Sequence, residues 1–308
     1  MKIGKILIGP STFAELDNSP MEKLISSGFE VINNPFKRKY TESELINLLS
    51  DNVIGLLAGL EPLNHKVLQQ SKLKVISRVG SGMSNVDLQA AKEFGISVCN
   101  TPTGPTRSVA ELTIGNMLIL IRMIPQMNWA LHNNNWDKKI GVLLEGKTVA
   151  IVGFGKIGKC VAELLKPFNA KIIIVDPFLK SEELNYSTLP IEDVLPIADI
   201  ISIHSSGDDC LFSDIEFSKM KRGVYILNAA RGGLISENAL LKALDNKIVA
   251  GAWLDSFENE PYKGPLTNYD QVILTPHIGS YTFECRKQME TEAVQNLINA
   301  LKASPLDD

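Results

Sequence analysis

The stretch TVAIVGFGKIGKC, residues 148–160, decides the fold of this chain. It begins as an apolar run typical of a buried strand and continues into a G-x-G-x-x-G turn, made by Gly153, Gly155 and Gly158, that opens a helix. The first glycine permits a tight turn, the second lets a pyrophosphate approach the backbone, and the third allows close helix–strand packing. The helix N-terminus adds N–H groups and partial positive charge. The stretch therefore predicts a dinucleotide-binding unit.

An acid follows the next apolar strand, and its position favours one dinucleotide over another. The segment KIIIVD, residues 171–176, ends in Asp176, 18 residues after Gly158. A carboxylate at this point accepts hydrogen bonds from the adenosine ribose hydroxyls. It also repels a 2′-phosphate, and Pro177 and Phe178 follow it where an arginine would be needed to bind one. We therefore expect NAD rather than NADP; the alternative is a solvated acid at a strand end.

Length and composition limit the class of protein. The 308 residues suggest about two domains, and a net charge of -4 with a pI near 5.7 argues against a nucleic-acid-binding surface. The longest apolar run, residues 114–124, contains Asn116 and Arg122 and is too short to span a membrane, and the N-terminus lacks the pattern of a signal peptide. The four cysteines have no metal-ligand spacing. We expect a cytoplasmic protein with reduced thiols and with no metal, membrane or nucleic-acid partner.

Apolar runs alternate with amphipathic stretches along the whole chain. This order predicts an α/β fold with parallel sheets and helices on both faces. The expected strands are residues 5–9, 30–33, 53–58, 74–78, 96–99, 148–152, 171–175, 200–204, 224–228, 250–255 and 272–275. The expected helices of the first half are residues 19–27, 41–50, 64–70 and 85–94.

A long apolar helix is expected between the two series of strands, in residues 107–132. Ser108 and Glu111 have capping-box spacing, which predicts a helix start there, and Pro125 predicts a kink or an end. Apolar residues cover nearly every face, so the helix is expected to be buried on more than one side, either between domains or between subunits.

Three further segments place reactive side chains just beyond predicted strands. Arg231 follows one strand in a glycine-rich turn, Asp255 ends the next strand with Glu260 five residues later, and His277 follows the last strand. In an open parallel sheet, ligands bind beyond the carboxyl ends of the strands. A guanidinium binds a carboxylate bidentately, a histidine carries protons near neutral pH, and a glutamate orients and stabilises it. Each residue alone has an ordinary structural explanation; together they favour a catalytic site.

At this point the sequence resembles the D-isomer-specific 2-hydroxyacid dehydrogenases, in particular phosphoglycerate-dehydrogenase-like members. The resemblance implies an NAD-dependent oxidoreductase acting on a D-2-hydroxy acid or 2-oxo acid, with Arg231 as substrate anchor, His277 as acid/base and Glu260 as its partner. It also implies that the amides of Ser81 and Gly82 hold the substrate carboxylate. The motifs that carry it are RVGSGMSNVD, NTPTGPTRSVAELTIGNML, GKTVAIVGFGKIG, ILNAARGGLI, LDSFENEP and PHIGS. The cofactor contacts that it implies are Lys156, Ile157, Asp176, Ala229, Ala230, Asp255, Gly279 and Ser280, with Thr106 near the nicotinamide.

The resemblance also implies a domain organisation. A flavodoxin-like substrate-binding domain is expected from residues 1–100 plus 284–308, with a Rossmann-like NAD-binding domain, residues 101–283, inserted into it. The segment 129–146, with Trp136, is similar to the arm that embraces a second subunit in this family, so a homodimer is expected.

Two departures and two open alternatives remain. Ser206 and Gly207 stand where the family usually has Pro-Leu, and Met83-Ser84 stands where an acid is frequent. An NAD-sensing dimeric regulatory protein on the same fold is the alternative to an enzyme. The basic cluster at residues 37–39 suggests a phosphorylated substrate such as 3-phosphoglycerate; its alternative is a solvated loop.

Overall fold

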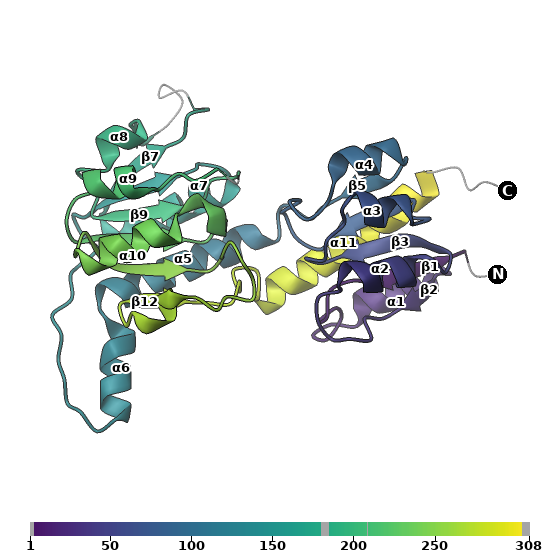
Figure 1. The fold of residues 1–308 in the computed structure, drawn as a ribbon, viewed down its shortest axis with the longest axis horizontal. Helices are drawn as coiled ribbons and strands as arrows, with labels where there is room; N and C mark the ends of the chain where they lie inside the picture. Colours follow the sequence, from purple (N-terminus) through teal and green to yellow (C-terminus); the bar gives the residue numbers. More distant parts are fainter. Residues whose placement is uncertain (1–2, 180–184, 208, 304–308) are drawn as a thin grey trace. The chain divides into compact units, whose positions relative to one another are not determined.

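The computed structural model describes residues 3–179, 185–207 and 209–303, and the chain divides into two compact units (Figure 1). Unit 1 comprises Met1–Pro105 and Ser280–Asp308, and unit 2 comprises Thr106–Gly279. Unit 2 is therefore an insertion into unit 1. This explains why the glycine-rich turn begins so late in the sequence: the first hundred residues build the other unit.

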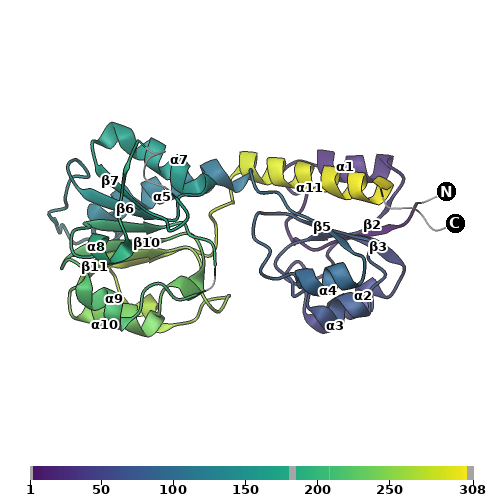
Figure 2. The ribbon, with the colours of Figure 1, turned by 90° about the horizontal axis from the view of Figure 1, so that it is seen from above.

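Unit 1 is a five-stranded sheet in the order β2-β1-β3-β4-β5, and every pair of neighbours is parallel. This is the flavodoxin-like strand order. Figure 2 shows α1 and α11 on one face of the sheet and α2, α3 and α4 on the other. All six residues of β3 are buried, as expected for a parallel strand covered on both faces. The elements are β1 (Lys5–Ile8), α1 (Ser19–Ser26), β2 (Glu30–Ile32), α2 (Glu42–Leu49), β3 (Val53–Ala58), α3 (His65–Gln69), β4 (Val75–Arg78), α4 (Leu88–Glu93), β5 (Ser97–Cys99) and α11 (Phe283–Ala303).

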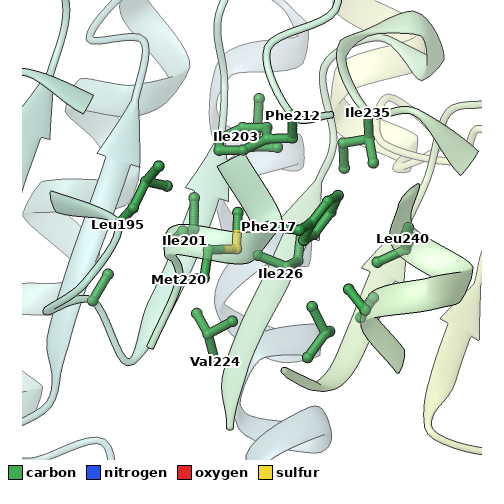
Figure 3. Packing of buried hydrophobic residues seen from close by; sticks show 14 of the residues in the cluster. Leu195, Ile201, Ile203, Phe212, Phe217, Met220, Val224, Ile226, Ile235 and Leu240 are labelled. Carbon is green, nitrogen blue, oxygen red and sulfur yellow. The ribbon is translucent and has the colours of Figure 1, made fainter. Parts of the chain in front are cut away.

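Unit 2 is a seven-stranded parallel sheet in the order β12-β11-β10-β9-β6-β7-β8, and the strand order reverses between β6 and β9. Side chains of α8, α9 and α10 pack on one face, around Phe217 and Ile226 (Figure 3), and those of α5 and α7 pack on the other. The elements are α5 (Pro105–Ile121), α6 (Ile124–His132), β6 (Thr148–Val152), α7 (Lys156–Leu165), η1 (Lys166–Phe168), β7 (Lys171–Val175), β8 (Ser187–Thr188), α8 (Ile191–Val194), β9 (Ile200–Ile203), α9 (Asp214–Lys219), β10 (Val224–Asn228), η3 (Gly232–Leu234), α10 (Glu237–Asp245), β11 (Val249–Leu254), η4 (Pro265–Asn268) and β12 (Val272–Leu274).

The expected strands are all confirmed to within one residue at each end, and one strand was missed. That strand, β8, is two polar residues long and pairs with Ile173 and Ile174 of β7. It carries no apolar run, so the sequence pattern had no means of indicating it.

The expected start of the long helix is wrong. The helix α5 begins at Pro105, so Ser108 lies inside it; the Ser108 hydroxyl donates to the carbonyl oxygen of Gly279 at 2.6 Å instead of capping the helix. The expected break is confirmed: α5 ends at Ile121, and α6 begins at a 65° bend with Pro125 in its first turn. In the described part of the chain no single helix is long and apolar enough to cross a membrane, although α5 and α6 counted together satisfy that criterion.

Candidate active site

The three glycines of the turn between β6 and α7 serve different purposes. Gly153 has φ +91°, and a Cβ there would lie 2.5 Å from the backbone of Ser205 at the end of the neighbouring β9. A Cβ on Gly158 would lie 2.2 Å from the carbonyl oxygen of Gly153, so this glycine permits close packing of helix on turn. A Cβ on Gly155 would meet nothing within 4 Å. Gly155 is also the N-cap of α7 and has no side chain to cap it, so the first N–H groups, beginning at Lys156 and Ile157, face open space at the end where an anion is favoured.

Asp176 lies at the carboxyl end of β7 and is part of the same turn. Its Oδ2 accepts from the Phe154 N–H at 2.8 Å, and its Oδ1 accepts from the Phe178 N–H at 3.0 Å. A carboxylate has about four lone-pair sites, so these two bonds leave acceptor capacity for hydroxyl groups. The half-buried Asp176 thus fixes the glycine-rich turn and can still bind a ribose.

The reversal of strand order places unsatisfied polar atoms beside this turn. His204 and Ser205 follow β9, and the His204 ring accepts or donates through Nε2 to the Ser202 hydroxyl at 2.8 Å. Burial lowers the pKa of His204 to about 4, so its imidazole is neutral at physiological pH. Within the described residues, His204 Nδ1 and the Ser205 hydroxyl are buried without hydrogen-bond partners. Buried polar atoms are rarely left unpaired, and these lie where α/β sheets bind dinucleotides, so the turn fits such a ligand.

Arg231 follows β10 and is held by a buried asparagine that sequence reasoning missed. Asn228, 1% exposed, donates through Nδ2 to the Arg231 carbonyl oxygen at 2.8 Å and accepts from the Ala230 N–H at 3.0 Å. These bonds fix the backbone of Ala229, Ala230 and Arg231. The half-buried guanidinium donates from one nitrogen to the Ala230 carbonyl oxygen at 2.8 Å. Its five N–H groups leave others for a bidentate carboxylate ligand.

His277 and Glu260 form the ion pair that the sequence analysis expected. The His277 Nδ1 lies 3.0 Å from Glu260 Oε1 and 3.1 Å from Oε2, and the Phe257 N–H donates to Oε1 at 3.1 Å. An ionised carboxylate can only accept, so Nδ1 carries a proton and Nε2 is the ring nitrogen that can exchange one with a ligand. The side chains of His277 and Glu260 are 39% and 30% exposed, so both remain accessible to a small molecule.

Asp255 and Gly279 occupy the turn that carries His277. Asp255, at the end of β11, is 2% exposed, and its carboxylate accepts from the N–H groups of Ile278 and Gly279 at 2.9 and 2.8 Å. Its surroundings are therefore protein atoms on most sides. Ser280, also expected at the cofactor, is half-buried and belongs to unit 1.

The remaining expected residues are placed by the two units separately. In unit 1, Ser81 and Gly82 form the loop after β4, and the Asn100 side chain donates to the Ser81 carbonyl oxygen at 2.9 Å. Among the described backbone hydrogen bonds, neither the Ser81 nor the Gly82 N–H donates, so both amides are available to a ligand. In unit 2, Thr106 lies half-buried in the first turn of α5.

Within unit 2 the site residues follow neighbouring strands at one edge of the sheet. His277 comes after β12, Glu260 after β11, Arg231 after β10, and the glycine-rich turn after β6. All these strands are parallel, so their carboxyl ends meet at the same edge (Figure 1). No group of three potential metal-ligating side chains occurs in residues 3–179, 185–207 or 209–303. The fold and this edge define a dinucleotide-binding α/β protein that carries an acid–base pair.

Comparison with known proteins identifies the family. A sequence model described as "D-isomer specific 2-hydroxyacid dehydrogenase, NAD binding domain" matches residues 114–279, more than half of the chain. D-3-phosphoglycerate dehydrogenases from Rattus norvegicus and Bacillus subtilis (strain 168) are 35% and 36% identical, over 98% and 95% of this chain and 57% of each relative. The TT0316 protein from Thermus thermophilus superposes with a TM-score of 0.89 at 30% identity, covering 97% of both chains. A glyoxylate reductase from Paecilomyes thermophila gives 0.87 at 28% identity, covering 98% of this chain and 97% of that one.

The chain belongs to the D-isomer specific 2-hydroxyacid dehydrogenase family, and it carries that family's NAD-binding domain. It spans a little over half the length of the curated relatives that it matches.

Proposed function

We propose that this chain is an NAD-dependent oxidoreductase that interconverts a D-2-hydroxy acid and the corresponding 2-oxo acid. The observation that carries the proposal is the His277–Glu260 pair, which lies on the same sheet edge as the glycine-rich turn and Asp176. Bound NAD(H) supplies or accepts the hydride. Family membership supports this class of reaction over a purely regulatory role.

The residues of this chain perform the binding and proton-transfer steps. Arg231 binds the substrate carboxylate and polarises the neighbouring carbonyl group, and the Ser81 and Gly82 amides bind the same carboxylate. During reduction, His277 donates the proton on Nε2 to the oxygen developing on C2; during oxidation, the neutral ring accepts it. Glu260 orients the ring through Nδ1 and stabilises the imidazolium.

The pH dependence of reduction tests the His277–Glu260 pair. Reduction needs protonated His277, so the rate falls as pH rises through the titration of this ring. Replacing Glu260 by glutamine removes a negative charge 3.0 Å from Nδ1. His277 then holds its proton less tightly, and we expect the falling limb of the kcat profile to move to lower pH in Glu260→Gln. Profiles of the two proteins that coincide would contradict the pairing.

Cofactor choice should depend on Asp176. Its carboxylate would repel the 2′-phosphate of NADPH, so we expect NADH to give the higher kcat/KM. The change Asp176→Ala removes the repulsion and also two hydrogen bonds to the glycine-rich turn. It should therefore narrow the NADH preference by about tenfold, equivalent to about 1.4 kcal/mol, while weakening NADH binding. Steady-state rates with both reduced cofactors measure this; an unmodified protein that prefers NADPH would overturn it.

For the substrate, a cavity in unit 1 supports a phosphorylated acid. It has a volume of about 580 Å³ and lies at the carboxyl ends of β2, β3 and β4, with Lys39 on its wall. Arg38 is engaged with both carboxylate oxygens of Glu44, at 2.6 and 2.9 Å, so it contributes less to an anion site. Burial raises the pKa of the nearby Glu61, and the positive charges of Arg78 and Lys39 act against this. Of the basic cluster, Lys39 is thus the residue placed to bind a phosphate.

We therefore expect 3-phosphohydroxypyruvate to be reduced faster than pyruvate or glyoxylate, with an advantage that shrinks in high salt. Lys39→Ala should reduce that advantage about tenfold or more, whereas Lys37→Ala, two residues away and not on the cavity wall, should not. Comparing kcat/KM for the three substrates checks this. A preference for an unphosphorylated apolar 2-oxo acid would remove the phosphate proposal and leave the reaction class in place.

The arm suggested by the sequence supports a homodimer. The segment after α6 presents large apolar side chains to solvent, among them Trp136, which is 75% exposed, and Ile140, which is 96% exposed. Exposed apolar side chains gathered in one segment are typical of a protein–protein contact. Sedimentation equilibrium should return twice the chain mass of 33.8 kDa. A monomer at micromolar concentration would exclude the dimer.

A further inference from the structure

A buried ladder of hydrogen bonds holds the turn that carries His277. The Oδ1 of Asp255 accepts from the Thr275 hydroxyl at 2.6 Å and from the Ile278 N–H at 2.9 Å. The Oδ2 of Asp255 accepts from the Gly279 N–H at 2.8 Å. One carboxylate therefore binds the turn on both sides of His277.

The direction of the ladder is fixed by a tryptophan. The indole Nε1 of Trp253, a residue with 0% exposure, donates to the Thr275 hydroxyl oxygen at 2.9 Å. An indole N–H can only donate, so the single hydroxyl proton of Thr275 is directed to Asp255. The order is thus Trp253 to Thr275 to Asp255, and a side chain without a hydroxyl at position 275 would leave the other two without that partner.

The ladder accounts for an unusual backbone conformation. His277 has φ +54°, in the left-handed region, and its N–H donates to the Thr275 carbonyl oxygen at 2.8 Å. A residue with a side chain stays in this region only where its surroundings fix it there. Thr275 before it and Ile278 after it are both bound to Asp255, and the Gly279 carbonyl oxygen accepts from the Ser108 hydroxyl at 2.6 Å. These contacts determine where the His277 ring points.

We propose that Thr275 and Asp255 are positioning residues for His277, and that Asp255 acts through the turn rather than as a direct ligand of the cofactor. Asp255 is 2% exposed, and both of its oxygens already accept hydrogen bonds from the protein. The assignment rests on the proposed function only in that His277 is the proton donor.

The test compares two replacements of Thr275. Thr275→Val keeps the shape and removes the hydroxyl, whereas Thr275→Ser keeps the hydroxyl. Misplacing a reacting group by about 1 Å can cost about a hundredfold in rate, so we expect kcat to fall about 10- to 100-fold in Thr275→Val and less than about threefold in Thr275→Ser. The dissociation constant for NADH, measured by fluorescence, should stay within about threefold in both, because the hydroxyl faces Asp255 and Trp253.

A second readout does not depend on activity. The amide protons of Ile278 and Gly279 should exchange with solvent slowly in the unmodified protein and in Thr275→Ser, and at least about tenfold faster in Thr275→Val. Unchanged exchange and unchanged kcat in Thr275→Val would overturn the proposal. So would an Asp255→Asn protein that binds NADH at least about tenfold more weakly with both amides still protected, because Asp255 would then be a direct ligand. If the unmodified protein binds NADH and shows the expected exchange but reduces no 2-oxo acid, the proposed function fails and the ladder stands.

Discussion

Replacing His277 by alanine should lower kcat for the best 2-oxo acid by at least about a hundredfold. A single general acid contributes about 10²–10⁴-fold to a rate, and Nε2 of His277 is the proton-exchanging nitrogen of the pair with Glu260. The dissociation constant for NADH should remain within about threefold, since the glycine-rich turn and Asp176 lie after other strands. Single-turnover reduction followed by NADH absorbance measures the effect.

The matched control is His65→Ala. His65 lies in α3 of unit 1, is exposed, and contacts Phe94 edge-on, so its removal should leave kcat unchanged. Near-normal turnover in His277→Ala would mean that the acid has been assigned wrongly, and the regulatory alternative would then need to be reconsidered.

Replacing Arg231 by alanine should lower kcat/KM by about 10²–10⁴-fold. A bidentate guanidinium–carboxylate contact comprises two charge-assisted hydrogen bonds, each worth about 1.5–3 kcal/mol. The loss should appear in both KM and kcat, because the same group holds the substrate and polarises its carbonyl. Arg231→Lys should recover only part of it, since an ammonium keeps the charge without the planar fork.

The control for this prediction is Arg222→Ala. Arg222 is an exposed arginine of the same unit that donates to the Asn246 carbonyl oxygen at 2.8 Å, and it lies before β10 rather than after it. Its removal should not change kcat/KM. Equal losses in Arg222→Ala and Arg231→Ala would show a general effect of charge or stability instead of a substrate anchor.

The sequence predicted most of the fold because strand periodicity and glycine placement are local signals. The runs at residues 53–58 and 148–152 are apolar throughout, and both are buried strands in the structure. The start of α5 was mispredicted because Ser108 and Glu111 match a local capping pattern, whereas the Ser108 hydroxyl binds Gly279, 171 residues away in the sequence. No local pattern contains that contact.

The same distinction explains the site. Arg231, Glu260 and His277 could be predicted because each follows a strand and the strands are parallel. Asn228 and Thr275 were missed because each lies at the end of an apolar run and acts on the backbone of a neighbouring residue. A polar residue that ends an otherwise apolar strand was the available signal. The roles of Ser81, Gly82 and Thr106 stay predictions.

The most direct test of the proposed reaction is the fate of the hydride. The unmodified protein would be incubated with the best 2-oxo acid and with NADH deuterated at both C4 positions, and the product analysed by mass spectrometry and on a chiral column. We expect one deuterium at C2 of the D-hydroxy acid, formed in equal amount to the NADH consumed. An L product, a product without deuterium, or no NADH consumption with any 2-oxo acid would contradict the proposed function.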